Sequence, residues 1–157
     1  MKVHISVGKE LVKPGYLNIA PITGGNVEGS VKADIRNLDE LVLDSECTEL
    51  IAENVLGYLE ANEADQTLLH WVKKLRHGGK IVIGGIDAHQ VSKMFYYKEI
   101  NIVEFNLLTH GMFSGPWDVL MSHTTIEDLQ KKLESCGVKI LKKRTDGFNL
   151  VIEGERP

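Results

Sequence analysis

Two histidines flank a glycine-containing stretch that could hold a ligand. His110 and His123 lie on either side of residues 111–122, where Gly111 and Gly115 interrupt any regular spacing of apolar residues. Loops of this kind on rigid scaffolds often hold substrates, and an imidazole can take the proton that a substrate loses near neutral pH. The two side chains are therefore candidate general bases, or alternatively surface histidines of an exposed loop.

A second pair of polar groups follows a predicted strand. Residues 49–53 are expected to form a strand, and Asn54 comes directly after it, with Tyr58 four residues later. Open α/β sheets bind ligands outside the carboxyl ends of their strands. Asn54 and Tyr58 could therefore orient an acceptor hydroxyl or amine, although a tyrosine alone is more often a half-buried packing residue.

Metal and disulfide chemistry are not indicated. His70 and His77 lie seven residues apart on a predicted helix, and no third ligand accompanies them. Cys47 and Cys136 are distant from each other and belong to no CxxC pattern. This use of cysteine is typical of a reducing compartment, so we expect a cytoplasmic protein without a metal site.

Length and charge narrow the class of protein. The chain has 157 residues, 43% of them hydrophobic and 25% charged, which predicts one globular domain over 1–157. The formal net charge is −4, and the basic run at 139–144 reads as a solvated strand edge, so no nucleic-acid partner is expected. Because no apolar stretch approaches about 20 residues, no membrane span is expected either.

Strand signals recur along the chain and end in a hairpin. The most regular run is 80–86, where β-branched residues are bounded by glycines. Asp146-Gly147 is a strong turn signal between the last two strands. The expected strands cover 3–7, 16–19, 31–35, 49–53, 80–86, 138–142 and 149–153.

Two segments show helical spacing. Residues 61–77 place apolar side chains on one face, with Asn62 as a candidate N-cap. Residues 125–136 follow a Thr124-x-x-Glu127 capping box. Strands that alternate with helices predict an open, mostly parallel α/β sheet with helices on both faces, and the closing hairpin predicts one antiparallel edge strand.

Short phrases spread over nearly the whole chain support a family resemblance. They are Val7-Gly8, Pro14–Ala20, Ala33–Leu38, Asn54–Leu59, Leu75–Lys80, His110-Gly111, His123 and Ser135–Val138. Their order resembles that of S-adenosylmethionine (SAM)-dependent methyltransferases with a Rossmann-like fold. The similarity is closest to small predicted methyltransferases associated with sugar and cell-envelope genes.

The resemblance implies a SAM site at the carboxyl ends of the first four strands. Val7 and Gly8 would let the backbone approach the amino-acid end of SAM. Asp34 would accept from the adenine amino group, and the backbone N–H of Ile35 would donate to a ring nitrogen. Asp34 is alternatively an ordinary turn residue. Asn54 would lie beside the methyl group.

The chain departs from this family at three places. A single glycine, Gly8, remains in the first loop, and Ala20 stands where the family has an acidic residue for the ribose hydroxyls. Gly57 and Tyr58 replace a glutamate–histidine pair of the family. Retention of SAM binding is therefore a separate question from retention of the fold.

Two functions follow as alternatives. The first is methyl transfer from SAM to a small or glycan-like acceptor, with His110 or His123 as proton acceptor and Tyr58 as an orienting group. The second is a catalytically inactive methyltransferase-like domain that binds a partner protein. The apolar run 94–97 would suit core packing or a homodimer contact. A dehydrogenase is disfavoured, because no Gly-x-Gly-x-x-Gly follows the first strand.

Overall fold

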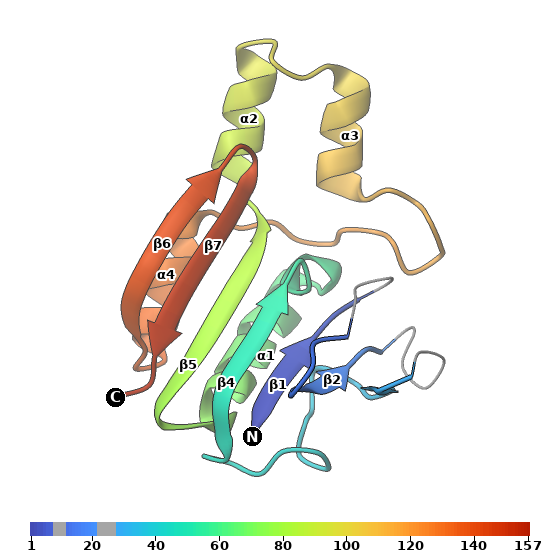
Figure 1. Ribbon diagram of the computed structural model, residues 1–157. Helices are drawn as coiled ribbons and strands as arrows, with labels where there is room; N and C mark the ends of the chain where they lie inside the picture. Colours follow the sequence, from blue (N-terminus) through green and yellow to red (C-terminus); the bar gives the residue numbers. More distant parts are fainter. Residues whose placement is uncertain (8–11, 22–27) are drawn as a thin grey trace.

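One seven-stranded sheet organises the protein. The computed structural model describes residues 1–7, 12–21 and 28–157, and its strands lie in the order β3-β2-β1-β4-β5-β7-β6 (Figure 1). The strands are β1 (Lys2–Ile5), β2 (Leu17–Ile19), β3 (Ser30–Val31), β4 (Cys47–Glu53), β5 (Leu75–Ile86), β6 (Lys139–Asp146) and β7 (Asn149–Glu155).

The strand directions confirm the predicted open, mostly parallel sheet. β1 pairs in parallel with β2 and β4, and the β2–β3 and β4–β5 pairs are parallel as well. β7 runs antiparallel to both β5 and β6, so the antiparallel pairing lies at the hairpin, with β7 as the reversed strand beside the edge strand β6. Its turn contains Gly147 at φ +59°, a left-handed conformation that suits glycine.

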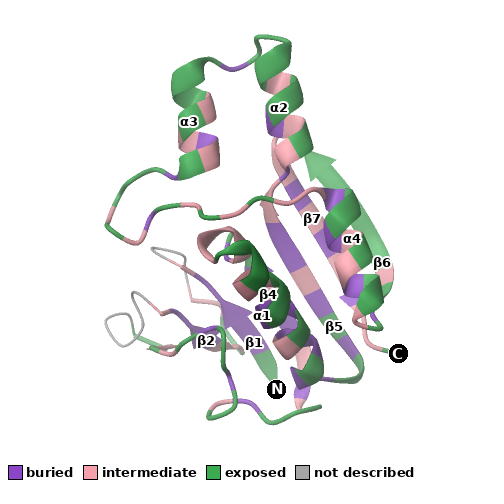
Figure 2. Cartoon of the chain, turned by 180° about the vertical axis from the view of Figure 1, so that it is seen from behind, coloured by how far each residue is buried: buried purple, intermediate pink, exposed green. Residues whose placement is uncertain are grey.

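The two longest helices cover the same face of the sheet. They are α1 (Ala61–Lys74) and α4 (Ile126–Ser135), which lie behind the strands in Figure 1 and in front of them in Figure 2. An ion pair of 2.7 Å between Lys132 and Asp65 joins them. This differs from the expected helices on both faces, because the described parts of the links from β1 to β3 (12–16, 20–21 and 28–29) hold turns rather than helices.

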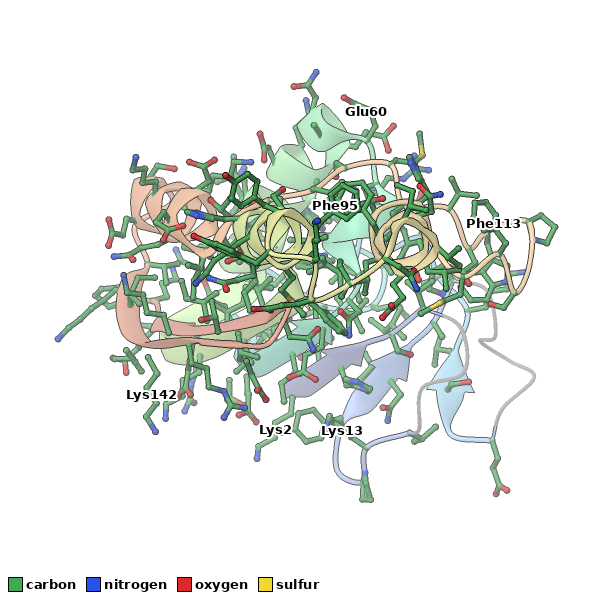
Figure 3. All side chains as sticks on the ribbon, turned by 90° about the horizontal axis from the view of Figure 1, so that it is seen from above. Lys2, Lys13, Glu60, Phe95, Phe113 and Lys142 are labelled. Atoms are coloured by element: carbon green, nitrogen blue, oxygen red, sulfur yellow. The ribbon has the colours of Figure 1, made fainter. Side chains whose placement is uncertain are left out.

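The opposite face of the sheet carries charged side chains. Leu50 and Ile81 are fully buried on the helix side, whereas their neighbours Glu49 and Lys80 reach the other side. Glu49 pairs with Lys2 at 3.7 Å, and Lys80 pairs with Glu153 at 3.6 Å. Seen from above, Lys2, Lys13 and Lys142 lie on the side away from the helices (Figure 3). Paired charges allow this face to remain in contact with water.

A run of turns over 33–46 packs on the helix side and is anchored to α1. The indole N–H of Trp71 donates to the Ile35 carbonyl oxygen (2.8 Å), and the Leu38 N–H donates to Nε2 of His70 (2.9 Å). The predicted strand over 31–35 is therefore shorter than expected, since Ile35 bonds to a helix rather than to a neighbouring strand.

Lys74 of α1 also holds the turns over 33–46, through a buried charge. Its side chain is 2% exposed, and its ammonium donates to Asp39 (2.5 Å) and Asp44 (2.8 Å). Burial alone would lower the pKa of Lys74, but the two carboxylates outweigh it and the net shift is upward. The lysine is therefore charged and fully paired, as a buried ion must be.

The helix caps lie close to the predicted positions but not on them. Glu60, rather than Asn62, has the extended backbone of an N-cap for α1 and accepts from the Glu63 N–H (3.4 Å). Thr125 caps α4 by accepting from the Asp128 N–H (3.2 Å), one residue later than the expected box. Two further helices, α2 (Ala88–Tyr96) and α3 (Ile102–His110), form an arm beyond the carboxyl ends of the strands (Figure 1).

We predict that His70 makes folding stability fall in mild acid. Its Nε2 accepts a hydrogen bond, and burial lowers the pKa of His70 below the ordinary value of 6.5. The unfolded chain therefore binds the proton first, and the stability present above pH 6.5 is lost as pH falls through the lower folded pKa. His70→Gln keeps an acceptor but does not titrate. Urea unfolding measured from about pH 7 to about pH 5 should show a steeper fall of the unfolding free energy in the wild type than in His70→Gln. An equal fall in the two proteins would contradict this role.

Candidate functional site

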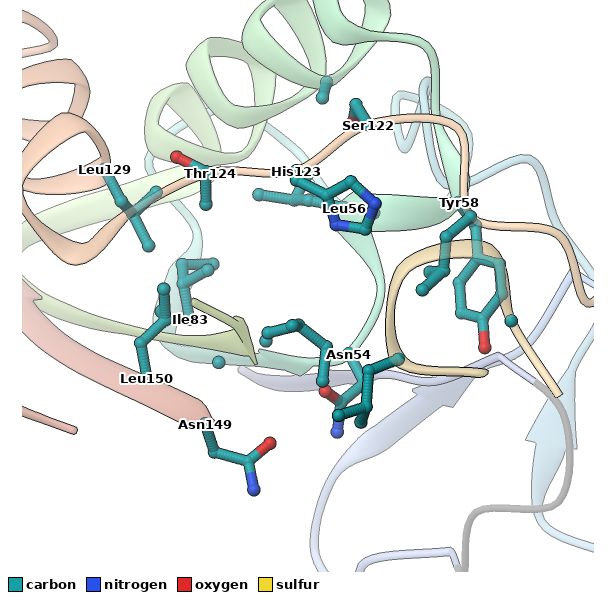
Figure 4. A pocket seen from close by; sticks show the side chains of 18 of the residues that line it. Asn54, Leu56, Tyr58, Ile83, Ser122, His123, Thr124, Leu129, Asn149 and Leu150 are labelled. Atoms are coloured by element: carbon teal, nitrogen blue, oxygen red, sulfur yellow. The ribbon is translucent and has the colours of Figure 1, made fainter. Parts of the chain in front are cut away.

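A cavity opens between the two large helices and the carboxyl ends of the central strands. Its volume is about 360 Å³, within the usual range of small-molecule sites. Figure 4 shows Asn54, Tyr58, His123 and Asn149 around it. The remaining lining is mainly aliphatic and includes Leu56, Ala64, Leu68, Ile83, Ile86, Leu107, Leu108, Leu120, Leu129 and Leu150.

Asn54 begins the turn that forms one side of the cavity. It follows β4 with φ +57°, a left-handed conformation in which asparagine is enriched among non-glycine residues. Its N–H donates to the Gly84 carbonyl oxygen (2.9 Å), while its side chain is exposed. The turn leads into the 3₁₀ helix η1 (Leu56–Tyr58), which carries Tyr58 to the cavity wall.

Asp118 holds the loop that roofs the cavity. Its carboxylate, 3% exposed, accepts from the Ser114 hydroxyl (2.6 Å), the Ser114 N–H (3.1 Å) and the Tyr58 hydroxyl (3.2 Å). The Ser114 hydrogen bonds are the main reason that the pKa of Asp118 lies below its usual range. Sequence reasoning saw Asp118 only as part of a loop, because nothing in the chain order shows that it meets Tyr58.

Of the two candidate histidines, only His123 lines the cavity. Its Nε2 lies 2.6 Å from the Thr109 carbonyl oxygen. Because a carbonyl can only accept, Nε2 must carry the proton, and Nδ1 is the free acceptor of the neutral ring. His110 lies at the end of α3, is exposed and does not line the cavity. The structure therefore brings Tyr58 and His123 together and leaves His110 outside.

The residues expected around SAM lie at one edge of the sheet. Val7, Ala20 and Asn54 follow the parallel strands β1, β2 and β4, so they share the carboxyl edge. The chain leaves β1 for β2 on one side and reaches β4 on the other, which is the switch point where such sheets bind ligands. Gly8 lies outside the described residues. Ala20 is 3% exposed, and no carboxylate replaces the ribose partner at that position.

Asp34 is already paired. Nε and Nη2 of Arg36 donate to its carboxylate at 3.0 and 2.9 Å, and Nη1 of Arg36 also reaches Glu63 (3.4 Å). The Arg36 guanidinium lowers the pKa of Asp34. Ile35 is buried beside it. An adenine amino group would therefore have to share this carboxylate with Arg36.

The structure brings together some of the residues expected around SAM, and one expected partner is missing. The switch point, Asn54 and the Asp34–Ile35 turn are present, whereas a carboxylate on β2 is not. Within residues 1–7, 12–21 and 28–157, no three metal-binding side chains gather as a site. No helix in the same ranges is long and apolar enough to cross a membrane.

Comparisons with known proteins show the fold of this chain but not its function. No protein-family model matches the chain, and no curated protein matches its sequence. Solved structures do match. A SAM-dependent methyltransferase from Methanosarcina mazei is 13% identical with a TM-score of 0.59, over 90% of this chain and 82% of that one.

Two Burkholderia thailandensis structures are similar in the same way. One is 1,6-didemethyltoxoflavin-N1-methyltransferase, with its substrate and S-adenosylhomocysteine bound (12% identity, TM-score 0.54, 90% of this chain and 62% of that one). The other is an O-methyltransferase family protein, which is 12% identical with a TM-score of 0.57, over 91% of this chain and 44% of that one. The chain thus spans less than half of the last protein, and at these identities the likeness shows a Rossmann-like methyltransferase fold alone.

We predict that Asp118→Asn loosens the roof of the cavity. Hydrogen bonds to a buried charged group contribute about 1.5–3 kcal/mol, so the unfolding free energy should fall by roughly that amount. Because the folded pKa of Asp118 is lowered, this contribution is present above the unfolded value near 3.8 and disappears as pH falls through the folded pKa. The test is urea unfolding at pH 7 and at about pH 3.

Asp65→Asn is the matched control. Asp65 also lines the cavity, but its ion pair with Lys132 is about half exposed and should contribute about 0–1 kcal/mol. Equal losses in the two variants at pH 7 would show that Asp118 is no stronger an anchor than a surface charge.

Proposed function

We propose that this chain is a SAM-dependent methyltransferase that acts on a small-molecule acceptor. The observation that carries the proposal is the position of the cavity: it begins at Asn54, at the same sheet edge as Val7 and Ala20. Cofactor and acceptor could thus approach from either side of the end of β4. The methyltransferases that share the fold, one of them with S-adenosylhomocysteine bound, support this assignment.

Each residue has a defined part in the proposal. SAM, when bound, supplies a methyl carbon on a sulfonium sulfur, so that transfer forms one bond from carbon to the acceptor and breaks the carbon–sulfur bond. Asn54 and Tyr58 would orient the acceptor, and Nδ1 of His123 would take its proton. Alignment alone accelerates such a displacement strongly. The proposed cofactor contacts are Val7, Gly8, Ala20, Asp34, Ile35 and Asn54.

An inactive, partner-binding domain is the second candidate. It is favoured by the missing carboxylate at Ala20 and by the pairing of Asp34 with Arg36. The arm formed by α2 and α3 exposes large apolar side chains, among them Tyr96 and Tyr97. A partner protein or a second copy of the chain could cover them.

Binding of S-adenosylhomocysteine separates the two candidates. We expect the purified chain to bind it with a Kd of about 1–100 μM in calorimetry. Asn54→Gly keeps the left-handed backbone but removes the carboxamide, and should weaken binding by about three- to tenfold. Failure to detect any binding of SAM or S-adenosylhomocysteine, in a protein that melts cooperatively, would favour the partner-binding domain.

Catalysis should depend on His123 and not on His110. With a panel of phenol, amine and sugar acceptors, His123→Ala should lower turnover by about 10²–10⁴-fold, the usual contribution of a general base. His110→Ala should leave turnover close to the wild-type value, because His110 lies outside the cavity. Both variants should bind S-adenosylhomocysteine normally. A loss that is larger in His110→Ala would overturn this assignment.

A further inference from the structure

A glycine lines the cavity at a point where a side chain would have free space. On β5, Ile81 and Ile83 are buried toward the helices, and Gly85 is the next residue in that row. A Cβ added at Gly85 would meet no atom within 4 Å, although Gly85 lines the cavity. By contrast, a Cβ at Gly84 would contact Glu53 on the opposite side of the strand (3.1 Å). The row of buried side chains on β5 thus ends at Ile83, and the next position in the row, Gly85, leaves the cavity open.

Most polar groups of the lining already have partners in the protein. Asp118 is bonded to Ser114 and Tyr58, Lys132 pairs with Asp65 at 2.7 Å, and the Ser122 hydroxyl donates to a backbone carbonyl (2.8 Å). A sugar carries a hydroxyl on nearly every carbon, and a hydroxyl buried without a partner costs about 1–3 kcal/mol. The interior is therefore poorly suited to a glycan.

Two carboxamides at one end of the cavity are different. Asn54 and Asn149 both line it and lie at the same side in Figure 4. Within the described ranges, neither side chain has a hydrogen-bond partner, and each can both donate and accept. His123, which also lines the cavity, offers Nδ1 in addition. The polar groups that lack partners thus lie at one end of the cavity, which we call its mouth, away from the aliphatic interior.

We propose that the cavity takes a largely apolar molecule of two fused or linked rings, with a single hydroxyl or ring nitrogen held at the mouth by Asn54 and Asn149. An apolar cavity of about 150 Å³ holds one benzene ring, so about 360 Å³ has room for two. That this molecule is the methyl acceptor rests on the proposed function. Its chemical class rests on the cavity alone and narrows the small or glycan-like acceptor to the apolar kind.

The test uses 2-naphthol as the probe and methyl glucoside as its polar counterpart. In calorimetry with the full chain, 2-naphthol should bind with a Kd below about 1 mM, whereas methyl glucoside should show no binding. Gly85→Leu places a side chain in the open volume and should weaken 2-naphthol binding at least tenfold. Val82→Leu, on the opposite face of the same strand, should leave it unchanged.

Two further variants keep the result decisive. If Gly85→Leu does not fold, Gly85→Ala adds only the Cβ that has free space, and should weaken binding about two- to threefold with normal melting. Asn149→Ala should weaken 2-naphthol binding by about three- to tenfold, because a hydrogen bond to the hydroxyl is lost.

Unchanged 2-naphthol affinity in both Gly85 variants would overturn the proposal, as would tighter binding of methyl glucoside that the Gly85 variants abolish. S-adenosylhomocysteine is titrated in parallel. Loss of 2-naphthol binding in Gly85→Leu, in a chain that never binds S-adenosylhomocysteine, would support the ring-binding cavity and reject the methyltransferase function.

Discussion

The buried hydrogen bond from the Trp71 indole to the Ile35 carbonyl oxygen holds together the apolar layer on which the sheet depends. Because α1 and α4 cover one face of the sheet, residues such as Leu50 and Ile81 are shielded from water by these helices and by the turns over 33–46. Those turns contain no helix of their own. The bond to Trp71 therefore satisfies a carbonyl that would otherwise be buried without a partner, and fixes the chain just after Asp34.

The same layer determines where ligands can bind. α1 and α4 cover one face of the sheet, but the side-chain row of β5 ends at Gly85, and a cavity remains between the helices there. The loop held by Asp118 closes the space from above. Aliphatic walls, a carboxamide mouth and the switch point of the sheet thus meet at one place, although they come from widely separated parts of the chain.

The sequence predicts most of the regular elements, because β-branched runs, the Asp-Gly turn and one-sided apolar spacing act locally. It predicts neither α2 nor α3; in α3, apolar residues such as Ile102, Val103 and Leu107 are not confined to one stripe of the helix. It also could not choose between His110 and His123, which look alike in a loop. Which of them lines the cavity depends on how the loop folds over residues far away in the sequence, as in the Asp118–Tyr58 bond, which joins residues 60 positions apart.

The arm of α2 and α3 has a small apolar cluster of its own, centred on Val91, Ile100 and Leu108 and separate from the main core. Cooperative units with few buried contacts open more readily than the rest of a protein. The arm should therefore open while the sheet stays folded, and its amide hydrogens should exchange with solvent earlier than those of β4 and β5. Its His110 end continues into the roof of the cavity. Each opening of the arm would thus widen the route by which a bulky ring compound enters or leaves the cavity.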